Sequence, residues 1–318
     1  MELIRGYHNL RPRHRHCVAT IGNFDGVHLG HQAVLGQVAE KAAELALPAV
    51  VITFEPHPQE FFAPQAAPPR LTRLREKLQA LRRYAAQRVL CLRFNRTLAA
   101  MQAATFIEHI LVAGLGVRYL VVGDDFRFGA GRHGDFALLQ TAGEQYGFQV
   151  ARMRAFCVDG ERVSSTRVRQ ALQRGDLAGA ERLLGRPYRM CGRVAHGDRR
   201  GRSMGFPTAN IHLHRRATPL AGVYAVEVFG LEREPLPGVA NVGTRPTVDG
   251  TRSLLEVHLF DFDGDIYRRY LQVDFLHKLR DETRFDSLEA LTRQISRDAE
   301  GARDFFANHR QGAVGHPS

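Results

Sequence analysis

Strand-like and helix-like patterns alternate through the first half of the chain, and this alternation constrains its fold more than any other feature. Apolar runs of strand length occupy residues 17–24, 49–56, 89–94, 119–126 and 149–156. Between them, apolar residues recur at helical spacing over residues 31–46, 73–86, 104–116 and 135–148. Repeated strand–helix units of this kind predict an α/β fold, with a parallel sheet covered by helices on both faces.

Polar motifs follow four of these predicted strands. They are GNFDGVHLGH at residues 22–31, EPHP at 55–58, GDDFRFG at 123–129 and SSTRVR at 164–169. The carboxyl ends of parallel strands meet at one edge of a sheet, and ligands bind beyond that edge. We therefore expect the four motifs to contribute to one binding site.

The pattern changes at GRPY, residues 185–188, where we place the boundary between a domain of residues 1–185 and one of residues 186–310. Short β-type runs separated by Gly, Pro and Asp-Gly then predict an antiparallel barrel or sandwich. FDGD at residues 262–265 predicts a tight hairpin turn between the last two strands. Residues 286–309 predict a helix capped by Asp286 or Ser287, and residues 311–318 a flexible tail.

The charge of the chain points to small anionic ligands. The 318 residues include 44 Lys and Arg against 33 Asp and Glu, a formal net charge of +11. The basic residues are spread along the chain, and their densest cluster, residues 11–16, has no interleaved aromatic residue for base stacking. We therefore predict small-molecule substrates such as nucleotides, and no nucleic-acid partner.

Other features of the composition concern the compartment. No apolar run approaches the about 18 residues of a membrane span, and residues 1–16 lack the apolar centre of a secretory signal. Cys17, Cys91, Cys157 and Cys191 form no CxxC pair, and we interpret them as reduced thiols. The sequence thus predicts a cytoplasmic protein with no membrane partner. The sequence does not determine the oligomeric state, and a homo-oligomer is possible.

The two histidines of GNFDGVHLGH stand where the helix after the first strand begins. A helix start presents unpaired N–H groups and the positive end of its dipole, which favours a phosphate. Gly22, Gly26 and Gly30 allow close approach to the backbone, and the imidazoles of His28 and His31 can contact phosphate oxygens. Phosphate binding is therefore our prediction. The alternatives are metal binding, with His57 as a third ligand, and simple capping of the helix.

Three other motif matches do not fit their surroundings. GAGRHG at residues 129–134 resembles a dinucleotide-binding loop, but it follows the fourth strand and no acidic residue ends the next one. GRSMG at residues 201–205 resembles a nucleophile elbow, but Pro207 excludes the helix that must follow. DFDGD at residues 261–265 begins like a calcium loop, but Ile266 and Gln272 stand where Gly and Glu are required.

Taken together, GNFDGVHLGH and SSTRVR resemble the motifs of HIGH-type nucleotidyltransferases. With TFEPHPQEFF and VVGDDFRFGAGRHGD, they resemble the FMN adenylyltransferase half of the bifunctional prokaryotic riboflavin kinase/FAD synthetase family. HGDRRGRSMGFPTANI, NVGTRPTV, LLEVHLFDFDGDIY and LRDETRFDSLEALTRQI resemble the riboflavin kinase half, in the family's order. The resemblance implies a Rossmann-like nucleotidyltransferase domain with a parallel sheet, followed by an antiparallel β-barrel riboflavin kinase domain with a C-terminal helix.

For the first domain, the resemblance implies that His28 and His31 act in catalysis by holding the phosphates of ATP. The ATP-binding residues that it implies are Gly22, Phe24, Asp25, His28, His31, Asp125, Arg162, Ser165, Thr166 and Arg169. The FMN-binding residues that it implies are Phe54, Pro56, His57, Pro58, Phe62 and Phe128. The implied reaction is attack of the FMN phosphate on the α-phosphorus of ATP, with release of pyrophosphate.

For the second domain, Thr208 and Asn210 of PTAN lie on the same face of an extended segment, and their oxygens suit a hard cation. The resemblance assigns them to Mg²⁺. It also implies that Glu256 is the base that takes the proton of the ribityl 5′-hydroxyl; a cross-strand ion pair is the alternative. It implies flavin binding by Arg280 and ATP binding by Gly197, Gly201, Arg202, Gly205, Thr208 and Asn210.

The sequence departs from the family pattern at two places. Arg268 stands where the family often has glycine, and Ser203–Met204 where Thr-Leu is commoner. Neither has an implied catalytic role. We predict a bifunctional enzyme that uses ATP and Mg²⁺ to phosphorylate riboflavin to FMN and then adenylylates FMN to FAD. The alternatives are a chain with one of these activities, an adenylyltransferase for a pantetheine or nicotinamide precursor, and a basic nucleic-acid-binding protein.

Overall fold

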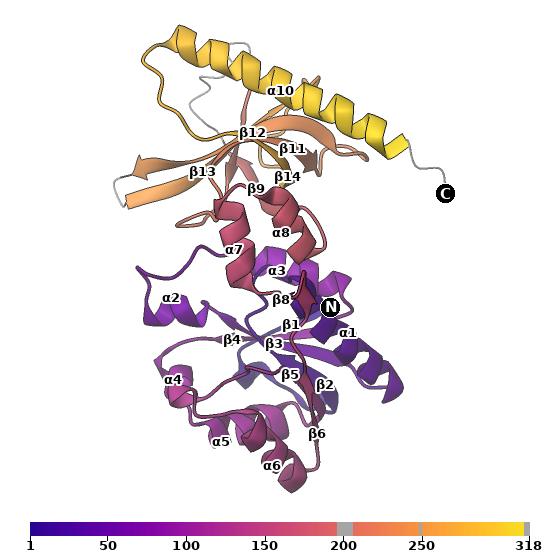
Figure 1. Ribbon diagram of the computed structural model, residues 1–318. Helices are drawn as coiled ribbons and strands as arrows, with labels where there is room; N and C mark the ends of the chain where they lie inside the picture. The colour runs from indigo at the N-terminus through magenta and orange to yellow at the C-terminus, as the bar shows by residue number, and fades with distance from the viewer. Residues whose placement is uncertain (196–205, 248–249, 315–318) are drawn as a thin grey trace. The chain divides into compact units, whose positions relative to one another are not determined.

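A computed structural model describes residues 1–195, 206–247 and 250–314 of the chain (Figure 1). The chain forms two compact units. One contains residues 1–68 and 72–165, and the other contains residues 69–71 and 166–318. Among the described residues, none of the helices is both long enough and apolar enough to cross a membrane.

The first unit contains a six-stranded parallel sheet with the strand order β1-β4-β3-β2-β5-β6. Its strands are β1 (Glu2–Arg5), β2 (Cys17–Ile21), β3 (Ala49–Glu55), β4 (Arg88–Arg93), β5 (Val117–Gly123) and β6 (Gln149–Met153). The predicted parallel sheet is confirmed. The sequence pattern did not predict β1, which adds an edge strand next to β4.

Helices follow the strands as predicted. They are α1 (Leu29–Glu44), α2 (Pro58–Phe62), α3 (Leu74–Arg83), α4 (Arg96–Ala99), α5 (Ala103–Phe106), the π-helical stretch η3 (Ile107–Gly114) and α6 (Phe136–Tyr146). The short elements are the 3-10 turns η1 (Tyr7–Asn9), η2 (Pro12–His14) and η4 (Ala130–Arg132), and the small hairpin of β7 (Cys157–Val158) and β8 (Glu161–Arg162).

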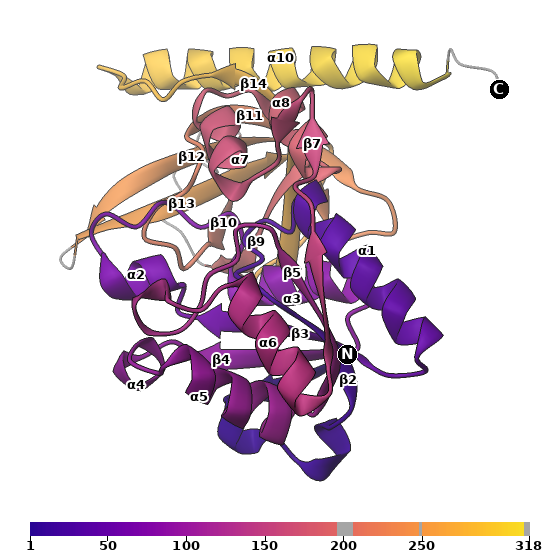
Figure 2. The same cartoon turned by 60° about the horizontal axis from the view of Figure 1, so that its bottom comes forward.

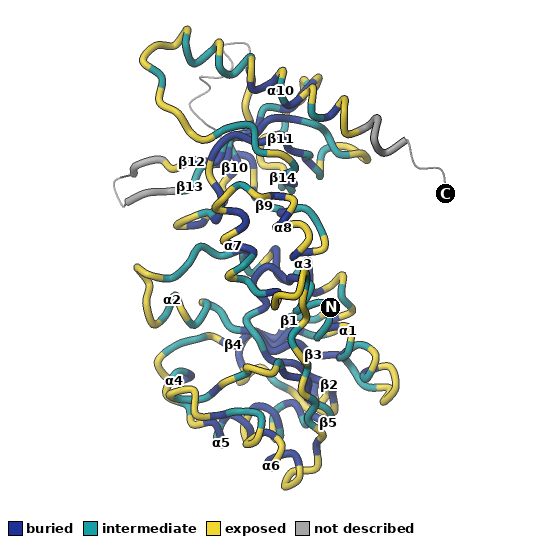
Figure 3. The backbone as a smooth tube through the Cα atoms, viewed as in Figure 1, coloured by how far each residue is buried: buried dark blue, intermediate teal, exposed yellow. Residues whose placement is uncertain are grey.

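Two apolar cores lie on opposite faces of this sheet. Val50 of β3 belongs to a core that includes Ile110 of η3 and residues of α6. The next residue, Val51, belongs to another core, with Leu35 of α1 and Leu81 of α3. Because successive strand residues point to opposite faces, helices cover both faces of the sheet. The central strands are accordingly buried along their length (Figure 3).

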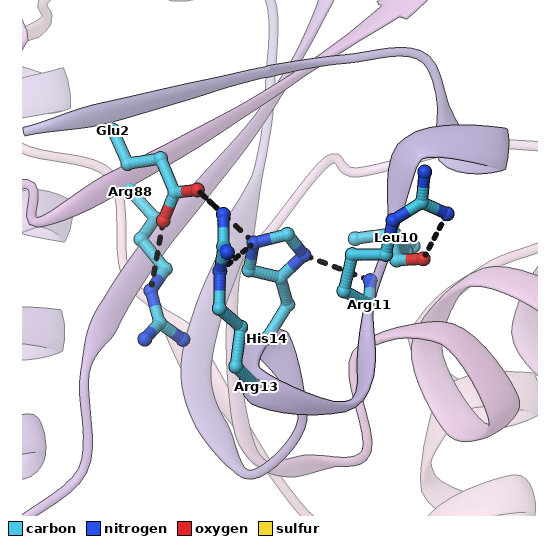
Figure 4. Close-up of polar contacts among 6 residues, drawn as sticks. All are labelled: Glu2, Leu10, Arg11, Arg13, His14 and Arg88. Atoms are coloured by element: carbon cyan, nitrogen blue, oxygen red, sulfur yellow. Dashed lines mark hydrogen bonds and ion pairs between the residues drawn. The ribbon is translucent and has the colours of Figure 1, made fainter.

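A charged cluster fastens the edge strand β1 to the turn η2 (Figure 4). One oxygen of Glu2 accepts hydrogen bonds from Nη2 of Arg13 at 2.8 Å and from Nε2 of the buried His14 at 3.1 Å. The backbone N–H of Arg11 donates to Nδ1 of His14 at 2.9 Å, which leaves the imidazole proton on Nε2, toward Glu2. The hydrogen bonds from Arg13 and His14 hold the pKa of Glu2 below its ordinary value.

Replacing Glu2 by Gln should therefore destabilise the first unit near pH 7 and not in acid. A carboxyl whose pKa is lowered by folding stabilises the native state above its unfolded pKa, and this contribution is lost as the pH falls through the folded value. For this partly exposed carboxylate we expect a Tm about 1–3 °C lower at pH 7. Thermal unfolding of both proteins at pH 7 and pH 3 measures this, and an equal difference at both pH values would contradict it.

The second unit contains a closed antiparallel barrel with the strand order β10-β13-β12-β11-β14-β9. Its strands are β9 (Tyr188–Ala195), β10 (Ala209–His212), β11 (Gly222–Phe229), β12 (Leu236–Thr247), β13 (Gly250–Leu259) and β14 (Tyr270–Arg280). Of the two predicted architectures, the barrel is the one observed. Helices α7 (Ser165–Gln173) and α8 (Leu177–Leu184) precede it, and α8 packs against β9 and β14.

Helix α10 (Leu288–Val314) lies lengthwise across the outside of the barrel (Figures 1 and 2). Its N-terminus is capped by Ser287, whose Oγ accepts a hydrogen bond from the N–H of Ala290 at 3.1 Å. Ala302 and Phe306 pack on Val223 of β11. The helix continues into the segment predicted as a tail, and residues 315–318 lie outside the described residues.

The prediction of a tight hairpin at FDGD is wrong. Strand β13 pairs with β10 and β12, whereas β14 pairs with β9 and β11. Residues 260–269 therefore connect two strands that are not neighbours in the barrel. An Asp-Gly turn signal shows where the chain reverses, but it does not show which strands pair.

Candidate active sites

The HxGH motif lies at the carboxyl end of β2, as predicted, and His28 is the N-cap of α1. Its Nδ1 accepts a hydrogen bond from the backbone N–H of His31 at 3.3 Å. In the neutral ring this places the proton on Nε2. His28 therefore does cap the helix, as one alternative proposed, and the cap also fixes which ring nitrogen is a donor.

The rings of His28 and His31 stack, with centroids 3.7 Å apart and planes at 16°. The ring of Phe24 lies 5.0 Å from that of His31. Nδ1 of His31 is buried and has no hydrogen-bond partner among the described residues. Burial, followed by the effects of His28 and the Lys77 cation, holds the pKa of His31 well below its ordinary value of 6.5. His31 is thus neutral at pH 7.

Addition of ATP should raise the pKa of His31. An anionic phosphate next to the ring favours the charged imidazole and offsets the cost of its burial. Because the bound state then takes up a proton, ATP that binds at these histidines as predicted should bind more tightly as the pH falls toward the pKa of the bound state. Titration of the imidazole by ¹⁵N NMR, with and without ATP, measures this at the single residue. An unchanged pKa would place the phosphates elsewhere.

Hydrogen bonds from two distant segments hold the loop before α1. The buried carboxylate of Asp25 accepts from the N–H of Thr72 at 2.9 Å and from its Oγ1 at 3.2 Å. Oγ1 of Thr72 in turn accepts from the N–H of Gly26 at 2.9 Å. Oγ of Ser165 donates to the backbone oxygen of Asp25 at 2.9 Å. Asp25 and Ser165, both predicted as ATP ligands, thus form hydrogen bonds that hold the loop in place.

A second set of contacts reaches the same loop through β3. The buried Lys77 of α3 donates to Oγ1 of Thr53 at 3.4 Å, and Thr53 donates to the backbone oxygen of Asn23 at 3.3 Å. Sequence reasoning named neither Lys77 nor Thr72 as a site residue. Their partners lie 24 and 47 positions away in the chain, and no local pattern indicates such pairs.

Several other predicted ATP ligands have defined partners. Arg162 forms ion pairs with Asp125 at 2.7 Å and with Asp124 at 3.1 Å. Nε of Arg169, which is buried, donates to the backbone oxygen of Pro69 at 2.7 Å within the second unit. Thr166 is exposed on the first turn of α7.

Two other predicted ATP ligands, Gly22 and Phe24, have structural contacts in the loop and in the core. Gly22 N–H donates to the backbone oxygen of Ile52 at 3.0 Å, so its backbone extends the pairing of β2 with β3. Phe24 is 2% exposed, and its ring belongs to the core beneath α1 and α3.

The segment after β3 presents an aromatic cluster. The Glu55–Pro56 peptide bond is cis, and Pro58 begins α2. His57 is the N-cap of α2, because its Nδ1 accepts from the N–H of Gln59 at 3.2 Å. The cluster consists of rings whose centroids are 5.3–5.9 Å apart, from Phe54, Phe61, Phe62 and Phe94.

Within this cluster Phe62 is 67% exposed, which is unusual for a phenylalanine and suits contact with a planar ligand. The sequence had indicated Phe54 and Phe62, but not Phe61 or Phe94. Phe128, also predicted to contact flavin, is instead buried in the core, stacked on Phe126 at 5.5 Å.

The described residues give no support to metal binding by His28 and His31. Over residues 1–195, 206–247 and 250–314, no group of three or more His, Cys, Asp and Glu side chains lies close enough together to hold a metal ion. His57, the proposed third ligand, uses Nδ1 to cap α2.

In the barrel, three of the predicted kinase residues lie in one row across neighbouring strands. Glu256 of β13 stands opposite Asn210 of β10 on one side and opposite Asn241 of β12 on the other. The row continues from Asn241 to Val223 of β11 and then to Arg280 of β14. Directly opposite residues share a face of the sheet, with Cβ atoms about 5 Å apart.

The surroundings of this row differ along its length. Glu256 and Asn210 are half-buried, and Thr208, two residues before Asn210, is exposed. Both direct neighbours of Glu256 are asparagines, so an ion pair with a directly opposite residue is excluded. Arg280 forms an ion pair with the buried Asp298 of α10, with Nη2 2.7 Å from Oδ2. The predicted ATP-binding residues Gly197, Gly201, Arg202 and Gly205 lie outside the described residues.

Comparisons with known proteins match a different family to each of the two parts of the chain. Residues 10–167 match the FAD synthetase family, and residues 184–306 match the riboflavin kinase family. The chain thus contains two enzyme domains of flavin metabolism in one polypeptide.

Relatives of nearly the same length contain both domains. The chain is 56% identical over 307 residues to the bifunctional riboflavin kinase/FMN adenylyltransferase of Escherichia coli K12, covering 96% of this chain and 98% of the relative. The proteins of the same name are 55% identical in Pseudomonas fluorescens and 51% in Haemophilus influenzae, covering 96% of this chain and 98% and 99% of the relatives. The chain belongs to the bifunctional riboflavin kinase/FMN adenylyltransferase family.

A solved structure shares the fold over almost the whole chain. It is a crystal structure from Streptococcus pneumoniae whose title describes a macrolide-efflux protein, with a TM-score of 0.80 and 31% sequence identity. The match covers 95% of this chain and 99% of that one.

Proposed function

We infer that this chain makes FMN and FAD, with the kinase reaction in the barrel and the adenylyl transfer at the parallel sheet. The observation that carries this conclusion is that one chain contains matches to both enzyme families, in the order of its bifunctional relatives. The matched regions also contain most of the residues that we propose for the two reactions. The alternative substrates, a pantetheine or nicotinamide precursor, find no support in these matches.

At the sheet, His28 and His31 would hold the phosphates of ATP at the N-terminus of α1. Nε2 of His28 carries a proton that can be donated to a phosphate oxygen. Nδ1 of His31 has no hydrogen-bond partner among the described residues, so this ring can still form a polar contact with a ligand. Arg162 and Asp125 lie at the surface, as an ion pair that could open to a nucleotide. No side chain need act as nucleophile, since the FMN phosphate attacks and pyrophosphate leaves.

The flavin would lie against the aromatic cluster of α2 and its neighbours. Phe54, Pro56, His57, Pro58 and Phe62 remain our proposed contacts, because Phe62 exposes most of its ring there. Phe128 acts through the core, as a support for Phe126, which is only partly buried.

In the barrel, Glu256 would take the proton from the ribityl 5′-hydroxyl as the γ-phosphoryl group of ATP is transferred to that oxygen. Thr208 and Asn210 fit a Mg²⁺ site, since a hydroxyl and an amide oxygen stand two residues apart in an extended segment beside this carboxylate. Bound Mg²⁺ supplies charge neutralisation at the phosphates. We keep Arg280 as a residue of the flavin-covering segment, positioned by its ion pair with Asp298.

We propose functional domains of residues 1–185 and 186–310. The SSTRVR motif at the start of α7 belongs to the proposed nucleotide site, so α7 is kept in the first domain, and the riboflavin kinase match begins at residue 184. We also propose small-molecule substrates without a nucleic-acid partner, and a cytoplasmic location. All four cysteines are free thiols, which suits a reducing compartment. Retention on DNA at physiological salt without flavin turnover would favour the nucleic-acid-binding alternative.

Incubation of the protein with riboflavin, ATP and Mg²⁺ tests the proposal. Separation of riboflavin, FMN and FAD over time should show FMN appearing first and FAD following it. FMN that accumulates without FAD would leave a chain with the kinase activity alone.

A further inference from the structure

Strand β10 holds the predicted Mg²⁺ ligand Asn210, but its pairing ends before it reaches Thr208. The ladder between β10 and β13 begins at Ala209 opposite Val257. Continued by one pair, the same register would set Thr208 opposite His258. Pro207 has no N–H to donate to a sheet, so backbone pairing alone does not hold this end of the segment.

The side chain of His258 holds it instead. Nδ1 of His258 lies 2.9 Å from the backbone oxygen of Pro207. A carbonyl oxygen can only accept, so Nδ1 carries the proton and donates it. The contact anchors the residue immediately before Thr208, at the point where the ladder stops.

The imidazole is itself held by aromatic neighbours. Its ring centroid lies 5.4 Å from that of Phe206 and 5.9 Å from that of Phe260, in both cases edge to face. Phe260 is buried in the core between α10 and the barrel, and Phe206 packs against that core. The donor atom therefore has a defined position, which an exposed histidine would lack.

We propose that His258 is a positioning residue for the cation site of the kinase reaction. Strand β13 would then serve this site twice, through Glu256 opposite Asn210 and through His258 on the Pro207 carbonyl. With both contacts made, Thr208 and Asn210 keep the spacing that a shared cation requires. This inference rests on the proposed riboflavin kinase function of the barrel.

Three variants separate the donated hydrogen bond from the bulk of the ring. The amide nitrogen of Asn can take the place of Nδ1, whereas the longer Gln places its amide nearer to Nε2, and Ala removes the donor. We expect His258→Ala and His258→Gln to raise hydrogen exchange in the backbone of residues 206–212 by up to about tenfold, the effect of one lost hydrogen bond. His258→Asn should exchange as the wild type does.

In the kinase assay, the Ala and Gln variants should need about five- to tenfold more Mg²⁺ for half-maximal FMN formation, and His258→Asn should restore the wild-type requirement. His277→Ala, which removes an exposed histidine of β14, is the matched control and should change neither measurement. Formation of FAD from added FMN does not use the proposed cation site and should stay constant.

Two results would overturn the inference. One is an Asn variant as impaired as the Ala variant, which would make the ring and not its donor important. The other is a wild-type Mg²⁺ requirement in the Ala variant. A wild-type protein that makes no FMN at any Mg²⁺ concentration would instead refute the proposed function, and the hydrogen-exchange comparison would still report on the Pro207 contact.

Discussion

Replacing Glu256 by Ala should reduce FMN formation by about 10²–10⁴-fold, the range that general-base catalysis contributes. The ribityl hydroxyl is a poor nucleophile until its proton is removed, and Glu256 is the carboxylate between the two asparagines of the barrel row. Conversion of added FMN to FAD should continue, because His28 and His31 and most of the other residues proposed for that reaction lie in the other unit. Chromatography of the three flavins over time measures both rates in one protein.

The matched control for this variant is Glu227→Ala, which removes a half-buried glutamate of β11 in the same barrel. It should leave the kinase rate within a few-fold of the wild type. Glu256→Gln preserves the volume and hydrogen-bonding capacity of the side chain but removes its basicity, so it should be nearly as inactive as Glu256→Ala. A fully active Gln variant would show that Glu256 is not the base.

The parallel sheet could be predicted because its signal is local. Each central strand is an apolar run followed by a helical period, and buried strands such as β2 and β3 must have this pattern. The edge strand β1 could not be predicted this way. Its sequence is only Glu-Leu-Ile-Arg, and it is held by contacts of Glu2 with residues of η2 and with Arg88.

The positions of the HxGH histidines could also be predicted, since both follow from the end of a strand and the start of a helix. The pattern could not show which residues of the motif face the site and which hold the loop or fill the core. Asp25 faces Thr72, 47 residues away, and Phe24 turns into the core, although both belong to the same ten-residue block as the histidines. One motif can contain residues that hold the loop and residues proposed to contact the ligand, and only the fold distinguishes the two roles.

The same holds for the barrel. PTAN indicated a cation site from two residues on one face, but the third contributor, His258, lies on another strand and acts through the Pro207 carbonyl. Its role depends on the register between β10 and β13, and register is set by which faces of the strands are buried across the whole sheet. The prediction of a hairpin at FDGD was wrong for a related reason. A turn sequence does not determine which strands are neighbours in a closed barrel.

Replacing His28 should stop FAD formation and leave FMN formation intact. Loss of a preorganised donor to a developing phosphate charge costs about 10²–10³-fold in rate. His28 also caps α1, so His28→Ala removes the cap together with the imidazole and would lower stability by about 1 kcal/mol. His28→Asn separates the two effects, because asparagine is among the best N-cap residues but cannot present an N–H at the position of Nε2.

We therefore expect both His28→Ala and His28→Asn to lose FAD formation, with only the Ala variant unfolding at a lower temperature. His109→Ala, at an exposed histidine of η3, is the matched control and should retain both activities. The measurements are the flavin time course and thermal unfolding on the same preparations. An Asn variant that forms FAD at the wild-type rate would mean that His28 serves the helix alone. A folded His28 variant without either activity would mean that the two reactions do not use separate sites.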